Sequence, residues 1–212
     1  MSRFAVTVLV LLGAGIWALI LAHNGWAVPV SFFAPLSAVV SVLVGALFVF
    51  NAWAWSWPIV SSLVHRPDLR GTWKGIIKPN THSSNTNVSS RGVDVYVVIR
   101  QTFSMVHVRL LSPESQSFSL AASLFEEAPE QFALTWIYRN EPRHLVTQRS
   151  PVHHGSGILR VGDAKAVAMS GHYWTDRNTS GEISLTLLSR ARVNDYDSAL
   201  TMLLLSVRNE SA

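Results

Sequence analysis

The chain has 212 residues, of which 49% are hydrophobic and only 14% are charged, whereas soluble globular proteins average about 25% charged residues. Cysteine is absent, which excludes disulfides, thiolate catalysis and cysteine-based zinc sites and mildly favours a cytoplasmic location. The net charge of +4 is compatible with an anionic ligand or membrane surface, but no basic run is long enough to indicate binding of a nucleic acid polymer.

Two apolar stretches occupy residues 1–60, which contain Arg3 and His23 but no Lys, Asp or Glu. The first, residues 4–22, has about 19 residues, enough for a helix to cross a hydrocarbon core of about 30 Å. The second follows a polar break and two prolines, at about residues 36–57. A cleaved signal peptide is the alternative for the first stretch, but a second apolar stretch so close behind favours a transmembrane hairpin.

Basic residues lie before the first stretch and after the second, while residues 24–35 between them contain none. The positive-inside rule therefore places both termini on the cytoplasmic side. A tryptophan cluster follows the second stretch, as is typical of indoles at the headgroup level; its members are Trp53, Trp55 and Trp57.

Small residues recur at every fourth position along one face of the second helix, which permits close helix–helix approach. That face packs either on the first helix of the same chain or on a second chain. It is formed by Ser37, Ser41 and Gly45.

Residues 61–70 are expected to form a linker, and residues 71–212 a cytoplasmic β-rich domain. Short runs rich in Val, Ile, Thr and aromatic residues, separated by turn residues, predict eight strands. Eight antiparallel strands in sequence favour a lipocalin-like up-and-down β-barrel, whose interior is filled by side chains or holds one small ligand; a sandwich is the alternative. Residues 195–207 have helical spacing and predict a short C-terminal helix. The strands are expected at 71–78, 92–101, 103–111, 116–125, 131–139, 155–161, 165–174 and 181–190.

Reaction machinery is hard to find, since the sequence has no phosphate loop, no HExxH, no Gly-x-Ser-x-Gly and no dinucleotide fingerprint. His153 and His154 are adjacent, so on a strand or turn they are expected to point to opposite sides, and we interpret them as solvated loop histidines rather than ligands of a shared metal. We therefore interpret the domain as a binding module, with no catalytic residue, metal or cofactor.

Arginines and aromatic residues on or beside the strands are the candidate ligand-binding residues. Aromatic faces stack on bases, and guanidinium groups pair with phosphates. The alternative is that these residues are core or cross-strand pairs, because about half of the strand residues of a barrel point outward. The candidates are Tyr96, Arg100, Arg109, Trp136, Tyr138, Tyr173 and Arg177.

Three motifs accompany this architecture: Pro-Asp-Leu-Arg-Gly-Thr-Trp-Lys-Gly at 67–75, Ile-Arg-Gln-Thr at 99–102, and the segment 171–181 that begins Gly-His-Tyr-Trp. With the two-helix hairpin and the β-rich domain, they resemble the two-transmembrane, β-strand-rich effectors of CBASS antiphage systems associated with SMODS-type nucleotide cyclases. The likeness covers essentially the whole chain.

The resemblance implies an eight-stranded barrel that binds a cyclic dinucleotide made by a partner nucleotide cyclase. It further implies a multi-pass protein of the bacterial inner membrane that forms a homo-oligomer on activation, contacts lipid and disrupts the membrane to cause abortive infection. Which cyclic dinucleotide binds does not follow from it. The Gly71-Thr72-Trp73 segment also looks like the Gly-x-Trp of lipocalin-type barrels, whose Trp packs under an Arg of the last strand, a role for Arg190 or Arg192.

Two other functions make different predictions. A membrane-tethered, lipocalin-like carrier of a small apolar molecule predicts a cavity lined by aliphatic and phenyl side chains without arginine, and a structural membrane protein predicts a filled barrel. For the receptor, we expect the loop 79–91 or the strand edges near the barrel mouth to change on binding and expose a barrel–barrel contact.

Overall fold

The computed structural model describes residues 14–15, 17–19, 23, 33–80, 92–148, 150–161 and 166–210. The chain divides into two compact units, Met1–Val49 and Phe50–Ala212. Most of the expected first span, most of the loop 79–91 and the side chain of Ser37 lie outside the described residues. Among the described helices, none combines the length and the apolar character needed to cross a membrane.

Helix α2 (Phe33–Ala52) covers much of the second apolar stretch and continues from the first unit into the second. The second unit then contains a 3₁₀ turn, a short helix, eight strands and a C-terminal helix. These are η2 (Ala54–Ser56), α3 (Pro58–Val64), β1 (Gly71–Pro79), β2 (Val93–Gln101), β3 (Val106–Leu111), β4 (Ser115–Ala128), β5 (Gln131–Pro142), η3 (His144–Val146), β6 (His153–Val161), β7 (Ala168–Thr175), β8 (Ser180–Ser189) and α4 (Tyr196–Glu210).

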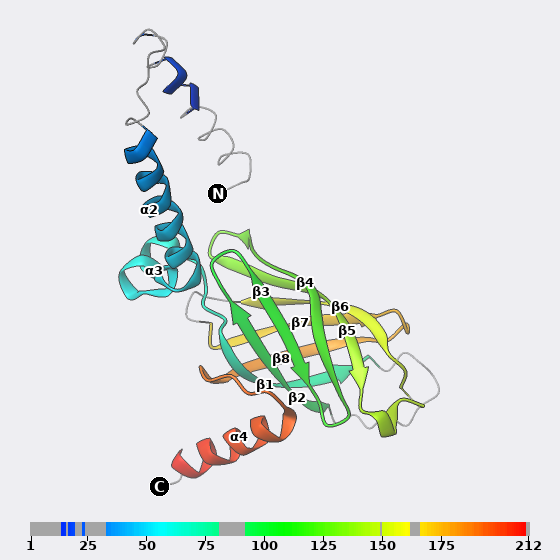
Figure 1. Cartoon of the computed structure of the whole chain (residues 1–212). Helices are drawn as coiled ribbons and strands as arrows, with labels where there is room; N and C mark the ends of the chain where they lie inside the picture. Colours follow the sequence, from blue (N-terminus) through cyan, green and yellow to red (C-terminus); the bar gives the residue numbers. More distant parts are fainter. Residues whose placement is uncertain are drawn as a thin grey trace. The chain divides into compact units, whose positions relative to one another are not determined.

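The eight strands form a closed antiparallel barrel in sequence order (Figure 1). β1 closes it by pairing with β8, with Gly75 opposite Leu185. Gly71 opens β1 at a φ of 135°, a conformation that disfavours a Cβ, and a Cβ there would also run into the carbonyl oxygen of Ser189. The barrel and the C-terminal helix confirm the predicted fold over the sandwich.

Alternation along the strands divides the barrel into an inner and an outer face. Inward side chains such as Val97, Ile99, Leu134, Leu159 and Leu185 are fully buried and form the main core. Burying a side chain of this size stabilises the fold by about 1.5–3 kcal/mol. The core fills one end of the barrel, which we call the closed end; the other is the open end.

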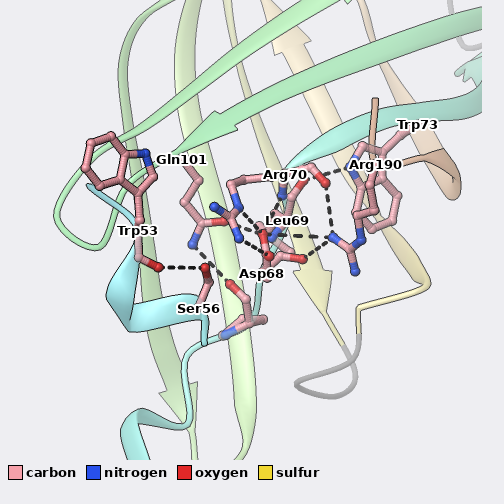
Figure 2. A network of polar contacts seen from close by, with 9 residues as sticks. Trp53, Ser56, Asp68, Leu69, Arg70, Trp73, Gln101 and Arg190 are labelled. Atoms are coloured by element: carbon pink, nitrogen blue, oxygen red, sulfur yellow. Dashed lines mark hydrogen bonds and ion pairs between the residues drawn. The ribbon is translucent and has the colours of Figure 1, made fainter. Parts of the chain in front are cut away.

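The closed end is sealed by the segment that precedes β1 (Figure 2). Trp73 is fully buried, and its indole Nε1 donates a hydrogen bond to the carbonyl oxygen of Leu69 at 2.9 Å. Arg190, which follows β8, donates from Nη1 to the carbonyl oxygens of Asp68 (2.8 Å) and Arg70 (3.0 Å). Figure 2 shows both side chains reaching the same segment, so Arg190 ties the two ends of the barrel sheet together.

The side chains of Gln101 and Asp68 at the closed end have polar partners. Gln101 accepts a hydrogen bond from the backbone N–H of Leu69 and donates one to the carbonyl oxygen of Pro67. Burial alone would raise the pKa of Asp68, but hydrogen bonds from Arg70 and the charges of Arg70 and Arg190 hold that pKa below its usual value. Gln101 and Asp68 therefore leave no unpaired side chain for a ligand at the closed end.

The first half of helix α4 packs against the outer face of β2, and the rest of the helix runs away from the barrel (Figure 1). The ring of Tyr96 meets that of Tyr196 edge-on, with centroids 5.3 Å apart. Val98 of β2 and Ala199 of α4 are buried in the same small cluster. As a result, the middle of β2, at Tyr96 and Val98, is buried on its outer face as well, whereas Asp94 and Arg100 on the same face are exposed.

Candidate ligand-binding site

A cavity of about 360 Å³ lies at the open end of the barrel. Its size falls within the range of about 300–1,000 Å³ usual for small-molecule sites. Its floor is apolar, where it meets the main core. The floor is made by Ile77, Val95, Leu110 and Ile183, whereas Val93, which is 43% exposed, lies at the rim.

Three aromatic side chains form one wall of the cavity: Trp136 and Tyr138 of β5 and Tyr173 of β7. Each stands opposite a glycine of the neighbouring strand. The pairs are Trp136 with Gly157, Tyr138 with Gly155 and Tyr173 with Gly181.

These glycines let the rings lie against the barrel wall. A Cβ added at Gly157 would be 2.5 Å from Cη2 and Cζ2 of Trp136, and one at Gly155 would be 2.5 Å from Cζ of Tyr138. A Cβ at Gly181 would be 2.8 Å from Cε1 of Tyr173. Since a Cβ at each position would run into the facing ring, the three glycines leave the room that the aromatic side chains occupy.

Both wall tyrosines stay protonated at neutral pH. Burial raises the pKa of Tyr138 to about 12, and the negative charges of ionised Tyr173 and of Asp176 act in the same direction. Burial also raises the pKa of Tyr173. Each phenol is therefore a neutral hydrogen-bond donor that an anionic ligand does not repel.

Arg177 places a cation at the mouth. It lies in the tight turn between β7 and β8, where its backbone N–H donates to Oγ1 of Thr175 at 3.2 Å. Its Nη1 donates to Oγ of Ser150 at 3.0 Å. A hydroxyl partner positions the guanidinium without neutralising it, so the group keeps its charge for an anion.

The rim is rich in neutral hydrogen-bonding groups, and none of the described residues that line the cavity is a carboxylate. His153 faces the cavity, whereas Nδ1 of the adjacent His154 lies 3.6 Å from Oδ2 of Asp176. The cavity thus combines flat aromatic surfaces, neutral donors and one guanidinium. The other rim residues are Ser112, Ser115, Ser117, Asn140, Ser150, Thr175 and Thr179.

The structure brings four of the seven candidate residues together at this cavity: Trp136, Tyr138, Tyr173 and Arg177. The other three, Tyr96, Arg100 and Arg109, lie on the outer face. They alternate with inward residues of β2 and β3, such as Val97 and Val108.

The outward candidates have partners of their own. Tyr96 packs under α4. The guanidinium of Arg109 lies 4.9 Å from the ring centroid of Phe118 and donates to Oε1 of Gln116 at 2.6 Å. With Arg100 and His107, Arg109 lines a separate hollow on the outside of the barrel.

Sequence reasoning did not select Asn140, His153 or the rim serines and threonines. Strand alternation was the available signal, because Trp136, Tyr138 and Asn140 are spaced by two residues on β5 and must share a face. The same spacing relates Ser115 to Ser117 on β4. Nothing local marks Gly157 as the partner of Trp136, since that pairing depends on the register between β5 and β6.

Comparison with known proteins adds an independent result. Residues 64–187, more than half of the chain, match the family model described as Cap15, cyclic dinucleotide receptor domain. The chain is also similar to proteins named CD-NTase-associated protein 15. The one from Staphylococcus schleiferi is 23% identical over 180 residues, which cover 85% of this chain and 87% of that protein.

Two further relatives carry the same name. The protein from Escherichia albertii is 25% identical over 149 residues, covering 66% of this chain and 73% of the relative. The protein from Yersinia aleksiciae is 26% identical over 175 residues, covering 80% and 78%. The family match begins in α3 and ends in β8, so it includes the whole set of cavity-lining residues described above.

Proposed function

The chain belongs to the family of Cap15 cyclic dinucleotide receptor domains, and from that membership we propose that its barrel binds a cyclic dinucleotide in the open-end cavity. The observation that carries the proposal is the aromatic wall of Trp136, Tyr138 and Tyr173 laid against three glycines. Stacking of a base on such a surface is worth about 1–3 kcal/mol and tolerates different bases.

The phosphates have matching partners. Arg177 supplies a charge-assisted donor at the mouth, and the phenols of Tyr138 and Tyr173 supply neutral ones. The absence of a carboxylate among the described lining residues avoids repulsion of a dianion. We propose Trp136, Tyr138, Tyr173 and Arg177 as the binding residues.

Neither rival function matches the cavity as well. A carrier of an apolar molecule needs an apolar lining throughout, whereas here the rim carries hydroxyls, Asn140, His153 and Arg177 beside the apolar floor and the aromatic wall. A purely structural barrel needs a filled interior, but the open end contains a cavity of about 360 Å³.

We further propose that this receptor is an antiphage effector of the bacterial inner membrane, activated by the product of a partner nucleotide cyclase. The uncharged stretch 4–22 and α2, whose described side chains from Val42 to Phe48 are mostly exposed and apolar, support membrane insertion. Ligand binding would then drive self-association, for which the face with Ser41 and Gly45 is the candidate, and membrane disruption would follow. A ligand can shift assembly only by binding the assembled form more tightly.

Calorimetry of the whole chain in detergent against a panel of cyclic dinucleotides tests whether the protein binds such a ligand. We expect one or more members to bind, and Trp136→Ala to weaken that binding. Absence of heat with every member would refute the receptor function. Crosslinking in membranes with and without the bound ligand tests assembly separately, and a ligand-dependent ladder that Gly45→Leu abolishes is the expected result.

A further inference from the structure

The segment between α2 and the barrel has an apolar outer face. We call residues 53–64 the collar; it consists of Trp53, η2, Trp57 and α3. The exposed fractions of Trp53 and Trp57 are 59% and 55%, and those of Ile59 and Leu63 are 86% and 82%. Four large exposed apolar side chains within one short segment indicate an interaction surface rather than scattered surface residues.

The collar is fixed to the barrel by Trp55. This residue is 1% exposed, and its ring centroid lies 6.5 Å from that of Phe103 in the turn between β2 and β3. The guanidinium of Arg70 lies 5.1 Å from the Trp55 ring. Trp55 therefore has a different role from Trp53 and Trp57, although all three had the same interpretation from the sequence.

Asn51 makes a second attachment immediately before the collar. Its side-chain Oδ1 accepts hydrogen bonds from the backbone N–H and Oγ of Ser104, at 3.0 and 2.8 Å. Its carbonyl oxygen accepts one from the N–H of Phe103 at 2.9 Å. With attachments at Asn51 and Trp55, the collar must move together with the β2–β3 turn.

The chemistry of the segment matches a lipid surface. Residues 50–67 contain His65 and Arg66 but no Asp or Glu, which suits an anionic bilayer. Indoles are favoured at the headgroup level, and aliphatic side chains at the acyl boundary below it. The collar also continues directly from α2, whose 20 residues carry no charge.

We propose that the collar docks on the interfacial layer of a lipid bilayer, with Trp53 and Trp57 at the headgroups and Ile59 and Leu63 deeper. This inference rests on the membrane placement proposed above. The collar joins the barrel at the β2–β3 turn, which belongs to the closed end, whereas the cavity lies at the opposite end. Docking would therefore point the ligand mouth into the water, where a soluble cyclic dinucleotide arrives.

Single-cysteine labelling tests the proposal in the full-length chain, which has no native cysteine. Ile59→Cys and Leu63→Cys carry the environment-sensitive fluorophore NBD on the collar. Leu145→Cys is the matched control, because Leu145 is 97% exposed and lies in η3 next to the open end. Each protein is reconstituted into vesicles of phosphatidylethanolamine and phosphatidylglycerol, with or without phosphatidylcholine that carries a nitroxide on its acyl chain.

We expect NBD at 59 and 63 to emit at shorter wavelength and to lose intensity with the nitroxide lipid, and NBD at 145 to do neither. Collar probes as water-like as the control would overturn the inference. A shorter wavelength without quenching would also overturn it, because a second copy or another protein would then cover the collar. Flotation of the vesicles separates the two proposals. If the protein floats but its collar probes are not quenched, only docking of the collar is refuted. If the protein does not float, the proposed membrane placement is refuted as well.

Discussion

Gly157→Ala tests whether the aromatic wall is the ligand platform. The new Cβ would stand 2.5 Å from two atoms of the Trp136 ring, whereas ordinary contact begins at 3.4 Å. The ring must therefore shift by about 1 Å, and the cavity that it lines offers open space for this shift. Overpacking of this kind costs about 1–3 kcal/mol of folding stability. Loss of one base stack costs about 1–3 kcal/mol of binding, or about 5- to 150-fold in Kd.

Calorimetry with the best ligand of the panel measures the binding loss, and thermal unfolding measures the stability loss. Gly92→Ala is the matched control, because its Cβ would run into Ile76, whose side chain points away from the cavity. It should lower stability without changing Kd. In a Trp136→Ala background, Gly157→Ala should have no further effect on binding. A folded Gly157→Ala protein with wild-type Kd would refute the reasoning.

The remaining predictions concern the charged and titratable side chains at the cavity and the arginine that seals the closed end. Arg177→Ala should weaken ligand binding by about 1.5–3 kcal/mol, whereas Arg109→Ala, on the outer face, should leave Kd within about twofold. If calorimetry shows a larger loss of binding for Arg109→Ala than for Arg177→Ala, the ligand does not bind in the open-end cavity. Since the folded-state pKa of Tyr138 is about 12 against an ordinary 10, wild type should lose up to about 2.7 kcal/mol of unfolding free energy between pH 10 and 12. In denaturant titrations, Tyr138→Phe should not show this loss of unfolding free energy. A variant whose unfolding free energy falls with pH as in wild type would contradict the prediction. Arg190→Ala should lower unfolding free energy by about 1.5–3 kcal/mol by removing its bonds to the chain before β1, with Arg192→Ala as the control expected to change little.

Most of the barrel could be predicted from the sequence because turn residues mark the ends of its strands. β8 is observed at Ser180–Ser189 against an expected 181–190. The expected strand 116–125 extends to Ala128 as β4, because Glu126 and Glu127 continue the β4–β5 hairpin as exposed strand residues that look like turn residues in the sequence. The strand expected from 103 begins only at Val106, since the preceding turn is held by Asn51, which is remote in sequence.

The binding face of β2 could not be predicted, and the reason is α4. A strand with one wet face alternates between apolar and polar residues, and that alternation identifies the inward side. In β2, Val95, Val97 and Ile99 face inward while Tyr96 and Val98 are buried under α4, so residues 95–99 form a continuous apolar run between Asp94 and Arg100. Only the position of α4 shows that Tyr96 belongs to the helix contact. The same strand thus supplies Val95 to the cavity floor and Tyr96 to the contact with α4.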